Sequence, residues 1–298
     1  MNIMWKRAAA LTAAAGAACL ARSEYEKKHL SVEVTEIISD KLKQDRDLVF
    51  LSDLHNNEFG HGNQDLVEAV CRLKPDAVLC GGDMMVCKGR RDVKVPLHLF
   101  RQLSACYPVY CGNGNHENRM VWERRVYGDL YEEYRDALMA MGVRYLEDST
   151  AALGEDILIS GIDLDECFYR KALCQSLLHM PAGYMEHKLG RGPAQRDRGR
   201  YTILLAHSPL YFDAYGDWGA DLTLSGHFHG GTIRIPGLGG VMTPQYQFFL
   251  PWCAGDFEKD GKRMIVSRGL GTHSINIRLN NRPQLVLVRL KRPNTIRR

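Results

Sequence analysis

Short apolar runs that end at polar residues constrain the fold of this chain more than any other feature. They are rich in Val, Ile and Leu, a length and composition that suit buried strands. The runs span 48–52, 77–80, 109–111, 157–161, 203–206 and 222–225. Between the early runs, residues 64–73 and 129–141 place apolar side chains at helical spacing. The first half therefore predicts a β-α-β-α-β order.

The second half of the chain is richer in strands. Residues 232–235, 263–267 and 285–290 are the candidates, and the last of these alternates in part between apolar and polar. This pattern predicts a mixed α/β domain with a second, partly antiparallel sheet. The Gly- and Arg-rich stretch 188–200 has candidate site residues on both sides, so it is an insertion and not a boundary. We therefore expect a single domain over residues 45–292.

The N-terminus has the layout of a signal peptide or of an uncleaved anchor. Lys6 and Arg7 precede the uncharged residues 8–20, and the charged stretch 22–28 follows. We expect residues 1–28 to be such a segment and the protein to be membrane-associated, with the side of the membrane open because basic residues flank both ends. A membrane span normally needs about 20 apolar residues. The alternative is a short helix packed on the domain.

Charge and cysteine usage exclude some classes of protein. The formal net charge of +4 is small for 298 residues, whereas nucleic-acid binders concentrate a large basic excess on one face. A nucleic-acid partner is therefore disfavoured. Nine cysteines occur without a C-x-x-C pair, which indicates free thiols and no zinc knuckle. Nothing in the sequence indicates an oligomeric state.

Five segments share one property, which is an Asp, Asn or His just after a predicted strand. They are Asp53-Leu54-His55, Gly81-Gly82-Asp83, Gly114-Asn115-His116-Glu117, Ala206-His207 and Gly226-His227-Phe228-His229. One histidine at a strand end is more often structural than a ligand. Five such segments in order indicate a shared site, because ligand sites of open α/β sheets lie at the carboxyl ends of the strands.

The spacing within these segments has a physical logic. Residues i and i+2 of an extended strand point to the same side, so Asp53 can act with His55, and His227 with His229. Glycines at 82, 114 and 226 allow sharp turns of the backbone. Carboxylate, imidazole and carboxamide donors without a thiolate suit Mn, Fe or Zn.

The order D-x-H, G-D, G-N-H-E, H, G-H-x-H over residues 53–229 resembles the signature of the calcineurin-like metallophosphoesterases. Residues 227–236, 267–271 and 281–283 resemble the membrane-associated bacterial branch, some members of which hydrolyse UDP-2,3-diacylglucosamine. The resemblance implies two mixed β-sheets packed face to face and flanked by helices, a four-layer sandwich. It also implies a phosphoric ester hydrolase.

By this resemblance, two divalent metal ions are bound. One takes Asp53, His55 and His229, the other takes Asn115, His207 and His227, and the carboxylate of Asp83 bridges them. Two divalent ions against two carboxylates leave the site about doubly positive, which attracts an anionic phosphate. A hydroxide that bridges the ions would attack the ester, with a phosphodiester or a pyrophosphate favoured.

His116 is the residue that we assign to the leaving group, as acid or as transition-state donor. Its ring needs an orienting partner, for which Glu117 is a candidate by proximity alone. Some relatives supply that partner from a G-D-x-x-D-R-G stretch. Here Asp83 is followed by Met84-Met85-Val86, so the G-D-x-x-D-R-G stretch is missing.

Other residues bear on the substrate, which we expect to be lipid-linked or nucleotide-linked. Arg119, Trp122, Arg124 and Arg125 could reach a phosphate or a base, or could form a solvated basic helix face. The stretch 246–252 reads Tyr-Gln-Phe-Phe-Leu-Pro-Trp and is either an apolar wall or, as we expect, core. The alternatives to hydrolysis of a small ester are a nuclease and a non-catalytic metal-binding scaffold. A scaffold would usually have lost a ligand or His116, and neither is lost.

Overall fold

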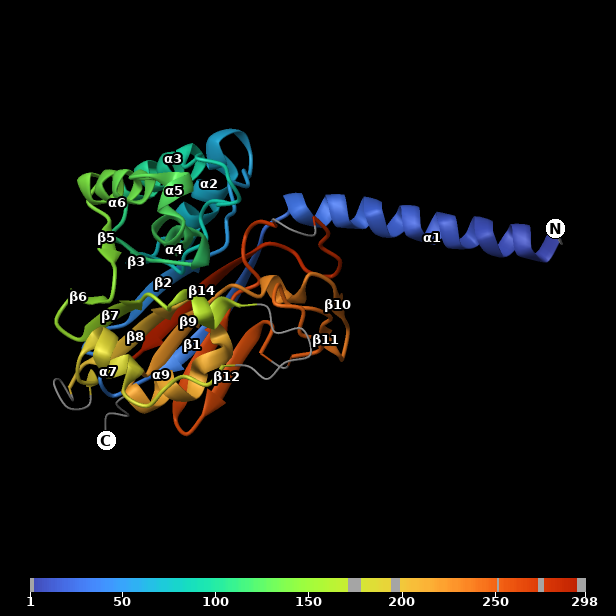
Figure 1. Cartoon of the computed structure of the whole chain (residues 1–298). Coiled ribbons are helices and arrows are strands. Elements are labelled where there is room, and N and C mark those ends of the chain that lie inside the picture. The colour runs from blue at the N-terminus through green and yellow to red at the C-terminus, as the bar shows by residue number, and fades with distance from the viewer. Residues whose placement is uncertain (1–2, 171–177, 194–198, 251, 273–275, 294–298) are drawn as a thin grey trace.

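Two six-stranded mixed sheets form the body of the protein (Figure 1). The computed structural model describes residues 3–170, 178–193, 199–250, 252–272 and 276–293. The first sheet has the order β1 (Ser31–Ile38), β14 (Gln284–Lys291), β2 (Arg46–Leu51), β3 (Ala77–Cys80), β4 (Val109–Gly112) and β5 (Arg144–Leu146). The second has the order β12 (Gly255–Lys259), β13 (Lys262–Val266), β9 (Leu222–Ser225), β8 (Tyr201–Ala206), β7 (Ile157–Ile162) and β6 (Ser149–Leu153).

Helices cover the outer face of each sheet. The first sheet carries α2 (Gln64–Leu73), α3 (Lys94–Ser104), α4 (Asn115–Trp122), α5 (Arg124–Tyr127) and α6 (Leu130–Ala140). The second carries α7 (Tyr184–Leu189) and α9 (Phe212–Trp218). Short 3-10 turns are η1 (His61–Asn63), η2 (Glu166–Tyr169), η3 (Pro209–Tyr211) and η4 (His229–Gly231), and β10 (Arg234–Ile235) pairs with β11 (Gly239–Gly240).

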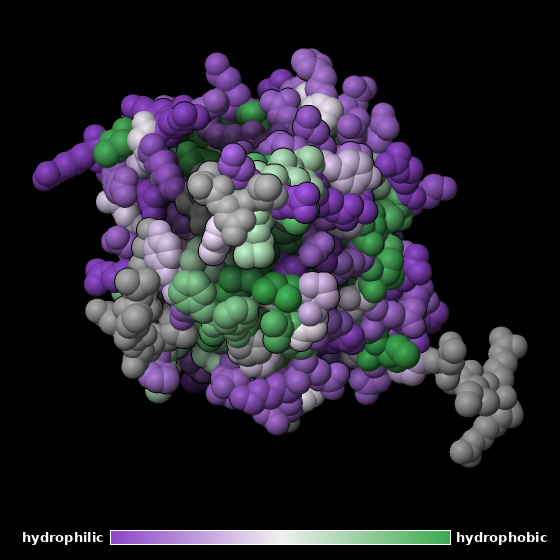
Figure 2. All heavy atoms as spheres, turned by 90° about the vertical axis from the view of Figure 1, so that its right-hand side faces the viewer, coloured by the Kyte–Doolittle hydropathy of each residue, from purple (hydrophilic) through white to green (hydrophobic). Residues whose placement is uncertain are grey.

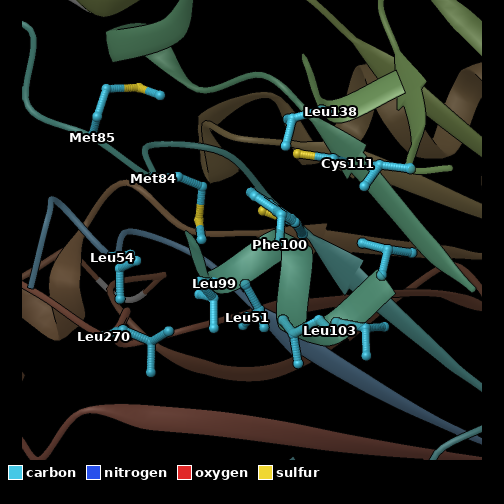
Figure 3. Close-up of a cluster of buried hydrophobic side chains, with 14 of the residues drawn as sticks. Leu51, Leu54, Met84, Met85, Leu99, Phe100, Leu103, Cys111, Leu138 and Leu270 are labelled. Atoms are coloured by element: carbon cyan, nitrogen blue, oxygen red, sulfur yellow. The ribbon is translucent and has the colours of Figure 1, made fainter. Parts of the chain in front are cut away.

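Alternation along β2 explains the layers. Leu48 and Phe50 belong to the core between the two sheets, whereas Val49 and Leu51 belong to the core beneath the helices. Figure 3 shows that second core, where Leu99, Phe100 and Leu103 of α3 lie over the sheet. Complete burial of each such side chain contributes about 1.5–3 kcal/mol. The predicted fold, two mixed sheets face to face between helices, is confirmed.

The predicted helix 64–73 is α2, and the predicted strands 77–80 and 222–225 are β3 and β9. Strand β1 has no counterpart among the predicted strands. It lies before residue 45 and pairs in parallel with β14, from Ser31 opposite Gln284 to Ile38 opposite Lys291. The folded body therefore includes residues that the expected range 45–292 leaves out.

The N-terminal segment is helix α1 (Ile3–Lys28), which projects from the body (Figure 1). Residues 4–22 are exposed. In the part of the chain that the structure describes, no helix combines the length and the apolar character needed to cross a membrane. The predicted membrane association through an uncleaved anchor is therefore wrong. The uncharged stretch 8–20 rises only about 20 Å as a helix, against a hydrocarbon core of about 30 Å.

Candidate metal centre

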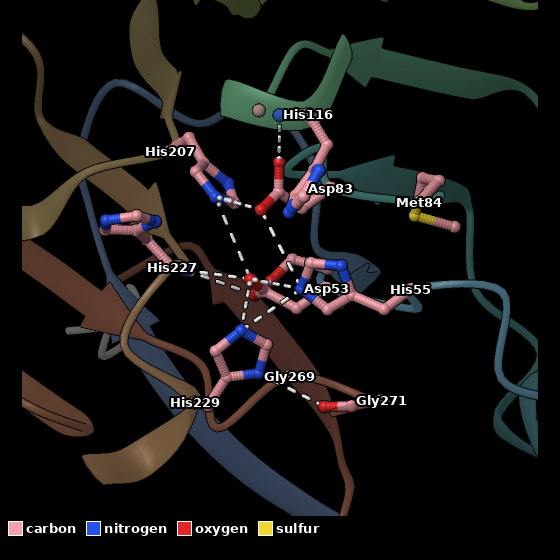
Figure 4. Close-up of polar contacts among 12 residues, drawn as sticks. Asp53, His55, Asp83, Met84, His116, His207, His227, His229, Gly269 and Gly271 are labelled. Carbon is pink, nitrogen blue, oxygen red and sulfur yellow. Dashed lines mark hydrogen bonds and ion pairs between the residues drawn. The ribbon is translucent and has the colours of Figure 1, made fainter. Parts of the chain in front are cut away.

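The turns that follow β2, β3, β4, β8 and β9 meet where the two sheets adjoin, and they carry all the predicted site residues. Figure 4 shows the side chains of Asp53, His55, Asp83, His116, His207, His227 and His229 converging there. Asn115 lines the same cavity as His116, His227 and His229. All eight residues are buried, with Asn115 the most exposed at 8%.

The first group that could hold a cation contains Asp53, His55 and His229. Nε2 of His229 lies 3.5 Å from Oδ1 of Asp53 and 3.1 Å from Nε2 of His55. Nδ1 of His229 is 3.1 Å from the carbonyl of Gly271, and Nδ1 of His55 is 3.4 Å from that of Met85. If each Nδ1 carries the hydrogen toward its carbonyl, two Nε2 lone pairs and a carboxylate face one another. That arrangement suits a shared cation, and the carbonyl contacts are typical of metal-binding histidines.

The second group contains Asp83, His207 and His227. Nε2 of His207 lies 3.2 Å from Oδ2 of Asp83, and its Nδ1 lies 2.7 Å from the carbonyl of Gly81. Oδ1 of Asn115 is buried without a hydrogen-bond partner among the described residues. A buried, unsatisfied carboxamide oxygen is costly unless it binds a ligand, so this group also fits a metal ion.

The electrostatics of the site favour bound positive charge. Burial raises the pKa of Asp53 to about 6. Burial acting alone would lower the pKa of His207, but the carboxylates of Asp83 and Asp53 raise it to about 10. Two buried carboxylates among histidines are the donor set expected for divalent transition metals.

The backbone hydrogen-bonds directly to the ring of His116. Nδ1 of His116 accepts a hydrogen bond of 2.8 Å from the N–H of Cys87, so in this contact the ring hydrogen is on Nε2. Burial lowers the pKa of His116, which favours the neutral ring. The sequence offered Glu117 as the orienting partner, and the structure shows a different contact for Nδ1.

Glu117 ties two of the site turns together. Its carboxylate accepts backbone N–H groups of Asp83 at 2.8 Å, Met84 at 2.8 Å and Gly114 at 2.9 Å. The N–H of His116 in turn donates to Oδ1 of Asp83 at 2.7 Å. The turns after β3 and β4 therefore form one hydrogen-bonded unit.

The backbone of the site differs from the extended form that the sequence suggested. Strand β2 ends at Leu51 and β9 ends at Ser225. Beyond them Asp53, His55, His227 and His229 have φ between 50° and 69°, and Asp83 has φ of 55°. The i and i+2 side chains therefore converge through left-handed turns and not through strand alternation. Such residues cost about 1–3 kcal/mol each and concentrate at functional sites.

Gly82 is the contact point between the turns after β3 and β4. Its φ is +85°, and a Cβ there would overlap the backbone of Asn113 and Gly114. We expect Gly82→Ala to lower the free energy of unfolding by more than about 1 kcal/mol, since strain and overlap add. Chemical denaturation measures this loss. Gly89→Ala is the control, because Gly89 also has positive φ but its Cβ would meet no atom within 4 Å. Equal losses in both variants would contradict the importance of the contact.

A cavity of about 220 Å³ opens beside the metal centre. Arg119 and Lys88 line it together with His116. Among the other candidates for substrate contact, Arg124 pairs with Glu132 and Asp129 on the surface, and Trp122 packs against Tyr169, with ring centroids 6.2 Å apart. Arg119 is therefore the one member of the set Arg119, Trp122, Arg124 and Arg125 that lines this cavity.

The stretch 246–252 is not core over most of its described length. Tyr246, Phe248 and Phe249 are exposed by 39%, 59% and 54%, and Tyr246 lines the cavity. Trp252 instead packs against Phe212 and Phe257. Figure 2 looks onto this side of the molecule and shows hydrophobic side chains gathered amid hydrophilic ones. The expectation of a buried segment is wrong for these three residues, although Thr243 and Gln245 just before them are buried.

The basic stretch 188–200 is only partly described. Lys188 at the end of α7 forms ion pairs with Asp148 at 2.9 Å and Asp165 at 3.4 Å. Arg196 and Arg198 lie outside the described residues.

Tyr169, Arg278 and Asn281 are among the residues at the site that were not singled out from the sequence. The ring of Tyr169 on η2 lies 5.2 Å from that of His227 and lines the cavity. Arg278 and Asn281 line it as well. Asn281 stands in the Asn-Arg-Pro segment that resembles the bacterial branch, which was a signal without an assigned role. Tyr169 and Arg278 follow no recognisable motif.

The comparisons with known proteins agree with this geometry. The family model of the calcineurin-like phosphoesterases matches residues 47–231, more than half of the chain. The chain is similar to the uncharacterized metallophosphoesterase YkuE of Bacillus subtilis, 24% identical over 96% of this chain and 94% of that protein. It is also similar to the phosphodiesterase YaeI of Escherichia coli, 22% identical over 82% of this chain and 81% of that protein.

Among solved structures, TT1561 of Thermus thermophilus matches 76% of this chain and 90% of its own at a TM-score of 0.48 and 14% identity. The family match, the relatives and the clustered donors together identify the class of the protein. The chain belongs to the calcineurin-like phosphoesterases and is a metal-binding phosphoric ester hydrolase.

Proposed function

We propose that the protein hydrolyses a phosphodiester or a pyrophosphate with two divalent ions of Mn, Fe or Zn. Asp53, His55 and His229 would hold one ion, Asn115, His207 and His227 the other, and Asp83 both. Bound there, the ions would lower the pKa of a water molecule and withdraw charge from the phosphate. The observation that carries the proposal is the presence of two donor groups. Within each group, the ring nitrogens and carboxylate oxygens lie within 4.8 Å of one another.

The protein's own residues would bind and orient the ester. His116 presents Nε2–H beside the donor groups, where it can donate to an oxygen of the leaving group as charge develops there. Arg119 is fixed next to it, because its Nη1 donates to the carbonyl of Cys87 at 3.1 Å. A guanidinium so placed can bind an anionic phosphate oxygen. Tyr169 and Tyr246 line the cavity and would limit access of water.

A simple diester tests this function. We expect the purified protein, freed of metal and then supplied with Mn²⁺, to cleave bis-p-nitrophenyl phosphate. Activity should disappear with a chelator and return with the ion, which absorbance of the released nitrophenol measures. Two bound ions without turnover of this diester or of a panel of pyrophosphates would contradict the proposal and indicate a metal-binding scaffold. Assaying the protein with nucleotides, sugar nucleotides and phospholipids as substrates, and identifying the products, then shows which class of ester it hydrolyses.

A further inference from the structure

The last two turns of α1 are built into the body of the protein. Ser23 and Glu26 are buried, with exposures of 1% and 0%. The hydroxyl of Ser23 accepts the N–H of Arg278 at 3.0 Å, and Oε2 of Glu26 accepts the N–H of Asn281 at 2.8 Å. These side chains therefore fix the backbone of segment 276–283 at two points. A cut after residue 28, as expected for a signal peptide, would remove both contacts.

Asn281 carries this support to the main chain of a predicted metal ligand. Its Nδ2 donates to the carbonyl of His229 at 2.7 Å and to that of Thr232 at 3.1 Å. Asn281 is itself fully buried. The position of η4, on which His229 lies, thus depends on where Glu26 holds Asn281.

Arg278 carries the support to the ring of the same histidine. Its guanidinium donates to the carbonyls of Gly269 at 3.2 Å and Gly271 at 2.7 Å. The carbonyl of Gly271 is the group that lies 3.1 Å from Nδ1 of His229. Such outer contacts set the orientation and the basicity of a metal-binding imidazole. Both the ring and the main chain of His229 are therefore supported from segment 276–283.

The charge of Arg278 also links Glu26 to the site. Arg278 is 1% exposed. Burial lowers its pKa to about 10, while the carboxylates of Asp53 and Glu26 act in the opposite direction. A buried guanidinium needs compensating negative charge. Glu26 and Asp53 are the carboxylates whose charge acts on it, and Oε1 of Glu26 also forms an ion pair with Arg22 at 2.7 Å.

We propose that Glu26 is a positioning residue for the metal centre, which holds His229 in its ligating orientation through Asn281, while Ser23 holds the neighbouring Arg278. The inference rests on the proposed role of His229 as a metal ligand. It assigns the end of the N-terminal helix to the functional site, although the sequence there resembles a removable segment.

The test compares Glu26 with Glu24 in the full chain. Glu24 lies on the same turn of α1, is 64% exposed and pairs with Lys27 at 2.6 Å, so Glu24→Gln and Glu24→Ala are matched controls. Titration of metal-free protein with Mn²⁺ should show about 10–100-fold weaker binding of one ion in Glu26→Ala, the usual range for outer contacts of a metal site. Glu26→Gln should weaken it less, because the amide oxygen can still accept from Asn281.

A second measurement separates positioning from general stability. In protein with ¹⁵N-labelled histidine, the Nδ1 signal of His229 should move in the Glu26 variants and stay in the Glu24 variants. Unchanged ion affinity and an unmoved signal in Glu26→Ala would overturn the inference even if its Tm falls. If Glu26→Ala does not fold, Glu26→Gln decides by the same criteria. Wild-type protein that binds no Mn²⁺ would overturn the proposed function as well, so the two failures are distinguishable.

Discussion

Replacing Asp83 with Asn is expected to abolish turnover and to empty the metal centre. Asp83 is 1% exposed, and one of its oxygens lies 3.2 Å from Nε2 of His207. The charge of His207 and its hydrogen bond hold the pKa of Asp83 well below the usual range against the effect of burial, so Asp83 offers a full negative charge. An amide removes that charge from a site proposed to hold two divalent ions. We expect activity to fall well beyond the about 10–100-fold typical of outer contacts.

Metal analysis and kinetics of Asp83→Asn test this expectation together. Asp156→Asn is a matched control, because Asp156 is also buried, 2% exposed, but accepts from Lys43 and Arg46 at the opposite end of the sandwich. The control should keep both ions and full activity, whatever its stability. Two ions retained in Asp83→Asn would refute the bridging role.

Replacing His116 with Ala is expected to remove most activity while both ions stay bound. Loss of one transition-state donor typically lowers kcat by about 10²–10³-fold. His116 lies within 4.8 Å of the ligand atoms of His55 and Asp83, but its Nδ1 bonds to the N–H of Cys87, so the ring is held without a metal. kcat should therefore fall more than KM rises. Steady-state kinetics with bis-p-nitrophenyl phosphate, together with ion content, measure both quantities.

The exposed His98 on α3 provides the control for this substitution. His98→Ala should keep wild-type kcat and KM. Full activity in His116→Ala would rule out the leaving-group role, and loss of an ion in that variant would instead make His116 a ligand.

Much of the fold could be predicted, because the patterns that carry it are local. The apolar run 77–80 is β3, and the helical spacing of 64–73 is α2. The pairing of β1 with β14 joins residues about 250 positions apart. Along β1, Val alternates with Glu and Thr, and Val32, Val34 and Ile38 are exposed, so the composition of this strand does not indicate that β14 is its partner.

The residue types of the candidate site could be predicted from the sequence, but the hydrogen bonds that orient those residues could not. The order of the motifs placed Asp53 and His229 in one predicted site. In the structure, Nε2 of His229 lies 3.5 Å from Oδ1 of Asp53. The partner of His116 is a backbone N–H of Cys87, and every residue except proline has such a group. Likewise Glu26 acts through backbone groups of a segment far along the chain. Contacts of this kind leave no residue signature, so only the folded chain reveals them.

The placement of the donors has a consequence for the cohesion of the whole molecule. Under the proposed assignment, each ion takes ligands from both sheets: Asp53 and His55 against His229, and Asn115 against His207 and His227. The ions would then act as cross-links between the two halves of the sandwich. Each tenfold excess of free ion over its Kd would add about 1.4 kcal/mol per site to the folded state. The concentration of free metal would thus affect both the rate of the enzyme and the free energy of unfolding of the two-sheet sandwich.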